Sequence, residues 1–329
     1  MLPRRVLPVP RTAVASPPAA DVYPRRWTLH GMNNGVIFGL TYHGVRRLPR
    51  SVSYAIGHVG SSIVARFAPE STTAIVENLR AVFPDETDAV LRRRALETYR
   101  SYTRDAIDFL RAIEDPRVEQ SFDIGDSTRE RAAWIYSQGR GAILVTAHFG
   151  NWEAGSLLMA RALRLPLTVV AMREPDETVN KIRSDIRARI GIETIEVRQS
   201  LDTPLKIRAA LAQNRFVALL VDRHLGRDRV PVTLFGRRAW FLRTPLLIAA
   251  LTGAPLAVSS IERSGPGRFV ATMGPPITIP NGASKDEWIP QAAQQIADEV
   301  AERVRARPEC WYHFYRYWDA QSDDYRGLE

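Results

Sequence analysis

The spacing of apolar side chains divides the chain into two regions. From Trp27 to about Asp115, apolar positions recur at steps of three and four, which predicts amphipathic helices. One apolar face runs through 75–83 and a second through 95–109, where arginines occupy the opposite face. After Val118 the pattern changes to short apolar runs that alternate with helical stretches. These runs are 142–147, 167–172, 216–221 and 255–261.

Runs that are apolar on both faces are typical of buried parallel strands with helices on each side. The sequence therefore predicts an α/β fold with a mostly parallel central sheet flanked by helices and a helical N-terminal part. We expect a flexible, proline-rich tail over residues 1–24, a helical, membrane-facing part over 25–115 and an α/β core over 116–329. The last two are expected to form one structural domain.

The segment Ser51–Phe67 is apolar, interrupted by glycines and flanked by arginines. This pattern fits either a core helix or an interfacial membrane helix with basic edges. No apolar run approaches the roughly 18 residues of a membrane-spanning helix, and the best one, Val36–Tyr42, is short. The proline-rich start also lacks the apolar centre of a cleaved signal peptide. Membrane attachment is therefore expected to be peripheral or through a weak anchor.

Composition indicates a cationic surface and removes some kinds of site. The 329 residues carry a formal net charge of +9, and all but three of the 45 cations are arginines. Arginine binds phosphate and carboxylate groups well, although GC-rich codons also favour it, so nucleic acid, an acidic membrane or a phosphorylated substrate are possible partners. The single cysteine, Cys310, excludes an intramolecular disulfide framework. Zinc-ligand spacings and nucleotide-binding glycine loops are missing, so we expect no metal and no cofactor.

The strongest chemical signal is the segment HFGNWE (148–153), which directly follows the first apolar run. A histidine where a buried strand meets a helix lies where open α/β sheets build their sites. Gly150 permits a sharp turn, and Asn151 is a good helix N-cap. Along one helix His148 and Glu153 would lie about 140° apart, whereas a strand–turn–helix lets the carboxylate fold back onto the imidazole. We therefore predict that His148 is a general base oriented by Glu153.

The motif contains no serine or cysteine, which favours direct transfer to a hydroxyl of a second substrate over a covalent enzyme intermediate. A His–Glu pair that only stabilises the strand end is the alternative interpretation. An oxyanion formed in the reaction needs hydrogen-bond donors. The backbone N–H groups of Gly150 and Asn151, or the side chains of Arg187 and Arg189, are the donors that the sequence offers.

In this strand–turn–helix setting, HFGNWE resembles the signature of the bacterial lipid A biosynthesis (lauroyl/myristoyl) acyltransferase family. That family belongs to the glycerophospholipid acyltransferase superfamily, with its His-x4-Asp/Glu motif, and includes the phosphatidylinositol mannoside acyltransferases. Three further segments are similar to elements of the family: ENLRAVFP (77–84), LLVDRHLGRDRVPVTLFGRRAWF (219–241) and TPLLIAALTGAPLAV (244–258). The similarity spans roughly residues 70–320.

The resemblance implies transfer of an acyl chain from a thioester of acyl carrier protein or coenzyme A to a hydroxyl of a glycolipid, at the cytoplasmic face of the inner membrane. It implies that His148 and Glu153 are the base and its partner. By the same resemblance, Asp222 and Arg223 match an acid and its neighbour after the second motif strand. Arg187 and Arg189 match the family's arginines ahead of a glycine. With Asn151 and Arg227 added, the expected substrate-binding set is Asn151, Arg187, Arg189, Asp222, Arg223 and Arg227.

Two features depart from the family pattern. Lipid A members usually begin with a recognisable transmembrane helix, whereas the corresponding region here is short and broken. In the mannoside branch an acidic residue follows the strand after the motif helix, where this chain has Met172, with Glu174 two positions later.

Two other segments keep open alternatives. The loop 223–238 holds five arginines and fits either a cradle for a phosphorylated group or a solvated surface. The aromatic segment 310–318 fits either core packing or an interfacial aromatic belt. His224 has no partner at a telling spacing and is interpreted as a loop residue.

We therefore expect a membrane-associated O-acyltransferase in which His148 deprotonates the acceptor hydroxyl. Its expected partners are an acyl thioester donor, a glycolipid acceptor (a lipid A precursor or a phosphatidylinositol mannoside) and an anionic membrane surface, with no nucleic acid. A non-catalytic, basic lipid-binding protein of the same fold is the alternative. A nucleic-acid binder is suggested only by the charge of +9, because no recognisable binding module is present.

Overall fold

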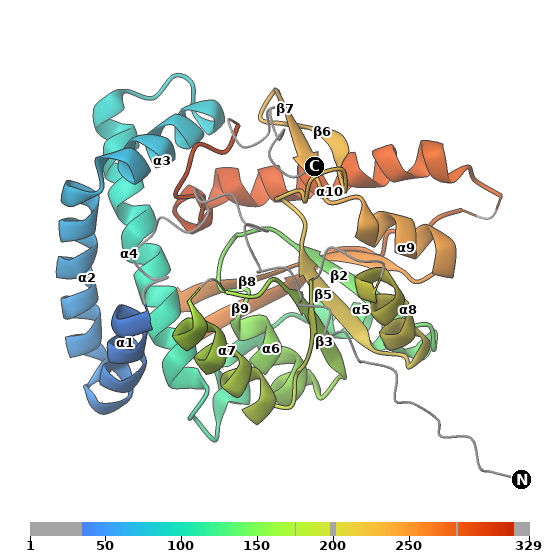
Figure 1. The fold of residues 1–329 in the computed structure, drawn as a ribbon, viewed down its shortest axis with the longest axis horizontal. Helices are drawn as coiled ribbons and strands as arrows, with labels where there is room; N and C mark the ends of the chain where they lie inside the picture. The colour runs from blue at the N-terminus through green and yellow to red at the C-terminus, as the bar shows by residue number, and fades with distance from the viewer. Residues whose placement is uncertain (1–34, 175, 198–201, 281, 319–329) are drawn as a thin grey trace, which may run out of the picture.

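A seven-stranded sheet forms the centre of the molecule (Figure 1). The computed structural model describes residues 35–174, 176–197, 202–280 and 282–318, so the tail expected over 1–24 lies outside the described residues. The strand order is β1-β9-β8-β2-β5-β3-β4, and every neighbouring pair is parallel except β8 and β9. This confirms the predicted α/β class with a mostly parallel sheet. The strands are β1 (Phe122–Ile124), β2 (Ala142–Thr146), β3 (Leu167–Ala171), β4 (Glu193–Glu196), β5 (Phe216–Leu220), β8 (Leu256–Gly265) and β9 (Arg268–Met273).

Helices cover both faces of the sheet, as the doubly apolar strands predict. In β2, Ile143 and Val145 belong to the core shared with α8, α9 and α10, while Ala142 and Leu144 belong to the core shared with α4 to α7. Successive strand residues point to opposite faces, so each of these strands contributes to both cores. The helices are α5 (Asp126–Ser137), α6 (Ala154–Leu157), the π-helical η4 (Leu158–Leu163), α7 (Glu177–Arg189), α8 (Asp202–Ala212), α9 (Thr244–Thr252) and α10 (Lys285–Ala306), with short 3-10 turns η3 (Val118–Ser121) and η5 (Pro308–Cys310).

The first four helices stand beside the sheet, at the left of Figure 1. The apolar faces predicted within 75–83 and 95–109 are buried, with Ile75 and Ala95 among the residues that join α3 to α4. Helix α2 lies on the outer side of α4. None of the described helices is both long enough and apolar enough to cross a bilayer. These helices are α1 (Gly35–Arg47), α2 (Arg50–Phe67), α3 (Pro69–Val82) and α4 (Asp88–Ala112).

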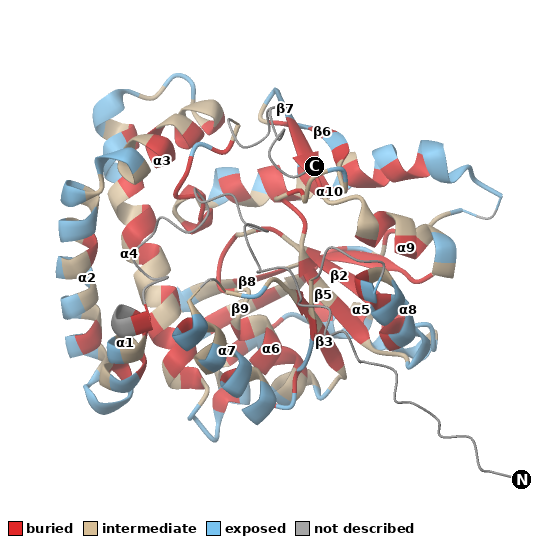
Figure 2. Cartoon of the chain, viewed as in Figure 1, coloured by how far each residue is buried: buried red, intermediate tan, exposed pale blue. Residues whose placement is uncertain are grey.

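Helix α2 exposes its large aliphatic side chains, and its two fully buried residues are small (Figure 2). Ser53 and Ser61 are the fully buried residues of this helix, and the Ser61 hydroxyl hydrogen-bonds Thr103 of α4 at 3.0 Å. Between them, a Cβ on Gly57 would come within 2.6 Å of Thr103, so small residues allow the two helices to approach closely. The core-helix interpretation of 51–67 is therefore wrong for its large apolar side chains.

Two segments outside the seven-stranded sheet approach its carboxyl edge. A hairpin of β6 (Val230–Leu234) and β7 (Arg237–Phe241), which the sequence did not predict, follows β5. The aromatic segment 310–318 pairs with the turn after β2 through a bridge between Trp311 and Phe149. Most of its rings are buried, so the core-packing interpretation of this segment is confirmed and the interfacial belt is wrong.

Candidate active site

The turn that follows β2 is fixed by two other parts of the chain. Gly150 has a backbone φ of +63°, and a Cβ there would lie 2.3 Å from the carbonyl oxygen of Ile261, so only glycine fits. The backbone N–H of Gly150 donates to Cys310 O at 2.8 Å, and that of Asn151 donates to Ile261 O at 2.7 Å. Both N–H groups are used within the fold, so the expectation that they stabilise an oxyanion is wrong.

His148 meets Asp222 at the carboxyl edge of the sheet. Strands β2 and β5 are parallel neighbours with Thr146 opposite Leu220, so the residues two positions beyond each strand end come together. His148 Nδ1 lies 2.7 Å from Asp222 Oδ1, and the backbone N–H of His148 donates to Asp222 Oδ2 at 2.9 Å. Asp222 is 0% exposed. It therefore orients the imidazole, and its expected assignment to substrate binding is wrong.

A second histidine, to which the sequence did not point, contacts the other oxygen of this carboxylate. His313 Nε2 lies 2.8 Å from Asp222 Oδ2, and His313 Nδ1 lies 2.9 Å from the Tyr315 hydroxyl. His313 is buried within the aromatic C-terminal segment. The four side chains form one hydrogen-bonded chain that runs from His148 to Tyr315.

The protonation states in this chain follow from burial and from mutual contact. Burial alone would raise the pKa of the Asp222 carboxyl, but the His148 and His313 rings hold that pKa well below its usual range. Burial lowers the pKa of both imidazoles, and the Arg223 guanidinium lowers that of His148 further. An ionised carboxylate only accepts hydrogen bonds, so His148 Nδ1 and His313 Nε2 carry protons. The lone pair of His148 Nε2 is left to accept a proton.

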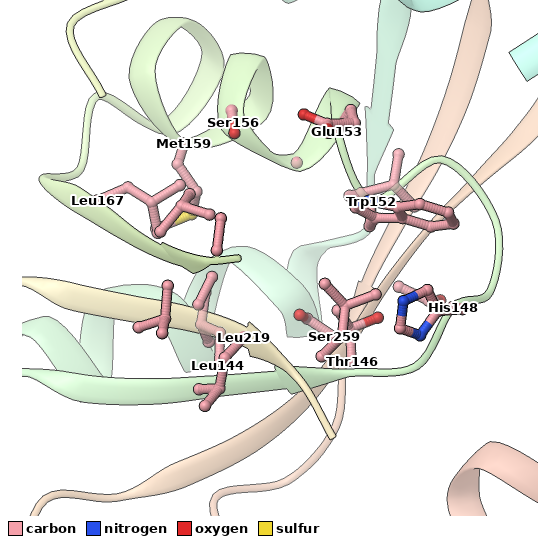
Figure 3. A pocket seen from close by; sticks show the side chains of 18 of the residues that line it. Leu144, Thr146, His148, Trp152, Glu153, Ser156, Met159, Leu167, Leu219 and Ser259 are labelled. Atoms are coloured by element: carbon pink, nitrogen blue, oxygen red, sulfur yellow. The ribbon is translucent and has the colours of Figure 1, made fainter. Parts of the chain in front are cut away.

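Glu153 has no hydrogen bond or ion pair with the imidazole. Its carboxylate accepts from Arg183 at 2.8 Å and lies 3.6 Å from Arg187 Nη2. The Trp152 indole lies between the side chains of Glu153 and His148 in Figure 3, with the Trp152 and His148 ring centroids 5.5 Å apart. The prediction that Glu153 folds back onto His148 is wrong, because the turn directs this carboxylate toward α7.

His148 lies at one end of a deep pocket between the sheet and the α6–η4 segment (Figure 3). The cavity has a volume of about 280 Å³. Leu144, Met159 and Leu167 line its far part, and Thr146 lies beside the imidazole. The η4 turn above the pocket is π-helical, a conformation found frequently at functional sites. A concave, mostly apolar cavity of this kind suits an aliphatic chain.

The two arginines expected to bind substrate from α7 point in different directions. Arg187 lines the pocket. Arg189 does not line the pocket. Its guanidinium donates to the Tyr42 hydroxyl at 3.0 Å and pairs with Glu114 at 2.8 Å. Residues two positions apart on a helix point about 200° apart, so both cannot face one cavity. Arg187 therefore lies in the pocket, where a substrate-binding residue is expected, and Arg189 lies outside it.

Asn151, Arg223 and Arg227 lie at different depths. Asn151 is buried, donates to the Asp105 carbonyl at 2.9 Å and accepts from the backbone N–H of Ala154 at 3.2 Å. It thus accepts the first backbone N–H of α6, as predicted for a cap, and it does not line the pocket beside His148. Arg223 lines the pocket, whereas Arg227 is exposed on the loop that leads to β6.

The three side chains at the centre also have donor atoms suited to a metal ion. Among the described residues, His148, Asp222 and His313 form such a group, with ligand atoms within 4.8 Å of one another. Each Asp222 oxygen lies at hydrogen-bond distance from one ring nitrogen. These distances fit a carboxylate between two neutral imidazoles, which is how we describe the cluster.

A carboxylate-oriented imidazole with a free lone pair can deprotonate a hydroxyl, and the adjacent apolar cavity is suited to an aliphatic chain. These are the requirements of an acyltransferase. Residues 24–320 match the family model described as bacterial lipid A biosynthesis acyltransferase. The chain belongs to this family, which confirms the resemblance inferred from the sequence, and it is an acyltransferase.

Curated relatives are similar to the chain over most of its length. It is 26% identical over 284 residues to a phosphatidylinositol mannoside acyltransferase of Mycolicibacterium smegmatis, covering 86% of this chain and 90% of the relative. It is 27% identical over 290 residues to a phosphatidylinositol mannoside acyltransferase of Mycobacterium tuberculosis, covering 87% and 88%. The alternative of a non-catalytic lipid-binding protein has no support from these relatives.

Proposed function

We propose that the protein moves a fatty acyl chain from an acyl thioester directly to a hydroxyl of a membrane glycolipid of the phosphatidylinositol mannoside type. The observation that carries this proposal is the 2.7 Å hydrogen bond between His148 and Asp222 at the end of an apolar cavity. The names of the relatives favour the mannoside over a lipid A precursor as acceptor.

In the proposed reaction the acyl chain lies in the pocket and its thioester carbonyl lies beside His148. Nε2 of His148 takes the proton of the acceptor hydroxyl while the hydroxyl oxygen attacks the carbonyl carbon. Asp222 keeps the proton on Nδ1 and stabilises the imidazolium that forms. The C–S bond then breaks, and the imidazolium returns its proton to the departing thiolate. No acyl-enzyme intermediate is formed.

The oxyanion of the tetrahedral intermediate needs a donor that the turn backbone does not supply. Arg223 lines the pocket, and its charge is close enough to lower the pKa of His148. Its position is supported by stacking on the Tyr315 ring at 5.1 Å. We assign the stabilisation of the oxyanion to this guanidinium, since a preorganised cation acts where negative charge develops.

Four charged residues on the α7 side of the pocket are suited to the sugar of the acceptor. Arg183 lies 2.8 Å from Glu153 and 3.3 Å from Glu174, and Arg187 completes the cluster. All four line the cavity. Alternating carboxylates and guanidinium groups offer both acceptors and donors to sugar hydroxyls with little net charge. Glu174 would then supply the acid that the sequence lacks at Met172.

The choice of acceptor is testable with defined lipids. The purified protein is incubated with a palmitoyl thioester and either a phosphatidylinositol mannoside or a lipid A precursor that still has a free hydroxyacyl group. We expect mass spectrometry to show one added acyl chain on the mannoside. Acylation of the lipid A precursor alone would contradict the proposed acceptor.

The pH dependence of kcat/KM reports on the proposed base. Burial and Arg223 lower the pKa of His148 to about 3, so its neutral, active form persists far below neutral pH. We expect kcat/KM to be nearly equal at pH 7 and pH 5.5, whereas a base with an ordinary histidine pKa of about 6.5 would lose roughly nine-tenths of its activity at the lower pH. An acid limb with its midpoint near the ordinary value would contradict a desolvated base.

We further propose that α2 attaches the enzyme to the membrane surface. Its exposed side carries an apolar stripe, Val52, Ile56, Val59, Ile63 and Phe67, with exposures from 41% to 79%. Exposed arginines stand near both ends of the helix, Arg46 and Arg47 before it and Arg66 within its last turn. An apolar helix face with basic edges suits the interface of an anionic bilayer, where the lipid acceptor resides.

Charge on the α2 stripe should release the protein from vesicles. Burying one large aliphatic side chain contributes about 1.5–3 kcal/mol, so Ile56→Asp with Ile63→Asp should weaken binding to phosphatidylcholine–phosphatidylglycerol vesicles by at least about tenfold. Leu205→Asp with Leu251→Asp is the matched control, since both leucines are 62% exposed on other helices. Equal losses in the two double variants, measured by vesicle flotation, would contradict attachment through α2.

A further inference from the structure

Two buried acids lie one turn apart on α4. This helix stands between α2 and the C-terminal segment that begins with η5 (Figure 1). Asp105 is 5% exposed and Asp108 is 0% exposed, whereas every other charged residue of α4 is at least partly exposed. Taking a carboxylate out of water is costly unless the group is paired, so the partners of these two acids indicate what each one does.

Asp105 is paired with residues that surround the active site. The Tyr312 hydroxyl donates to Asp105 Oδ2 at 2.6 Å and lies 3.1 Å from the Ser101 hydroxyl. The Arg263 guanidinium lies 3.3 Å from the other oxygen of Asp105. Burial and the charge of Asp105 raise the pKa of Tyr312 well above its usual range, so its hydroxyl keeps its proton and donates it. A hydrogen bond to an ionised acceptor is roughly twice as strong as one between neutral groups.

Tyr312 in turn fixes the backbone of His148. The backbone N–H of Tyr312 donates to His148 O at 2.7 Å, and the N–H of His148 donates to Asp222 at 2.9 Å. Both backbone polar groups of His148 are therefore held in place. The Tyr312 ring lines the pocket, whereas its hydroxyl is bonded to α4.

The backbone of Asp105 holds the other side of the same turn. Its carbonyl oxygen accepts from Asn151 Nδ2 at 2.9 Å, and Asn151 begins the turn into α6. One residue of α4 thus reaches the segment around His148 by two routes. The side chain acts through Tyr312, and the main-chain carbonyl acts through Asn151.

We propose that Asp105 is a positioning residue, which acts through Tyr312 to hold the His148 imidazole where acyl transfer needs it. This inference rests on the proposed function, in which His148 is the base. His148 lies on the turn after β2, outside the strand itself, so its position depends on contacts of this kind. Misplacement of a reacting group by about 1 Å can cost about 10²-fold in rate, which gives a buried anchor a measurable effect.

Asp108 is a matched control on the same helix. It accepts from the Tyr54 hydroxyl at 2.5 Å and lies 3.3 Å from the Arg50 guanidinium, so it repeats the kinds of partner that Asp105 has. Both of its partners belong to α2, on the side of α4 away from the active site. Loss of the tyrosine hydroxyl should therefore lower the melting temperature in both pairs, but should disturb His148 in only one.

The test compares Tyr312→Phe with Tyr54→Phe in the full-length protein. The lipid acceptor is dispersed in detergent, so that attachment of α2 to a bilayer does not enter the measurement. We expect Tyr312→Phe to lower kcat by about ten- to a hundredfold and to leave KM for a palmitoyl thioester within about twofold, because the ring stays in the pocket and only the hydroxyl behind it is lost. Tyr54→Phe should leave kcat within about twofold. Equal losses of kcat in the two variants would overturn the proposal.

Variants of Asp105 test whether it acts through the Tyr312 hydroxyl. Asp105→Asn keeps an oxygen that can accept from this hydroxyl, so it should retain more activity than Asp105→Ala. Combining Asp105→Ala with Tyr312→Phe should lower kcat little further than either change alone, because both changes break one contact. Losses that multiply in the double variant would show that the two residues act independently, and would overturn the proposal.

A spectroscopic measurement separates the positioning of His148 from the reaction. The proton on His148 Nδ1, in its bond to Asp222, should give a downfield proton resonance that is assigned by its loss in His148→Ala. We expect this resonance to shift in Tyr312→Phe and to stay in place in Tyr54→Phe. If the wild type acylates no lipid and the resonance still responds in this way, the proposed function fails and the positioning of His148 is supported. An unchanged resonance in a folded Tyr312→Phe variant would overturn the positioning role.

Discussion

Replacement of His148 by alanine is expected to lower kcat for acyl transfer by at least about 10²- to 10⁴-fold without unfolding the protein, which is what a positioned general base contributes. Nε2 of this residue has a free lone pair and lines the pocket, while Nδ1 is bonded to Asp222 at 2.7 Å. Removing the ring leaves the acceptor hydroxyl without a base. The turnover of a palmitoyl thioester in the presence of lipid acceptor measures the effect.

The control for this substitution is His43→Ala, which removes an exposed histidine of α1. Circular dichroism and thermal melting should give folded proteins in both cases. Activity close to that of the wild type in a folded His148→Ala variant would contradict the proposed mechanism. A comparable loss in His43→Ala would show that the effect is not specific to the site.

The second large effect is expected at Asp222, and it distinguishes Asp222 from Glu153. Asp222→Asn keeps the shape of the side chain but offers an NH₂ group where an acceptor is needed, so one of the two imidazoles loses its partner. We expect kcat to fall by about 10²- to 10⁴-fold. Glu153→Gln should instead raise KM for the lipid acceptor and leave kcat within a few-fold, because its carboxylate contacts Arg183.

The same pair of variants gives a result that a purely structural role would not produce. Loss of the Asp222 charge removes the carboxylate that favours the protonated imidazole, so the pKa of His148 falls further and the acid limb of the residual Asp222→Asn activity should lie at lower pH than that of the wild type. The opposite pattern, with kcat abolished in Glu153→Gln and retained in Asp222→Asn, would restore the pairing that the sequence suggested. Steady-state kinetics over a range of acceptor concentrations separates the two.

Much of the fold could be predicted from the sequence because its buried strands are short and apolar on both faces. The runs 142–147 and 216–221 became the neighbouring strands β2 and β5. Each run is followed directly by a polar residue, His148 or Asp222, and this shared feature was the signal for the pair. Strand order could not be deduced from the runs, so spacing along the chain pointed to Glu153 instead.

Two other features depend on tertiary contacts that leave no local pattern. His313 lies in an aromatic segment without periodicity, and it reaches Asp222 only because this segment returns to the turn after β2. In α2, apolar residues at helical spacing predict a face, but not which side of the helix is buried. The contact of Ser61 and Gly57 with α4 decides that side, and the large residues face outward.

The most direct test of the central claim is a single-turnover reaction with a labelled palmitoyl thioester and the host's polar lipids. We predict that label passes to a lipid at the rate at which thiol is released, that both depend on the lipid, and that denatured protein retains no label. Label bound covalently to the protein, or thiol release without a labelled lipid, would contradict direct transfer by the His148–Asp222 pair.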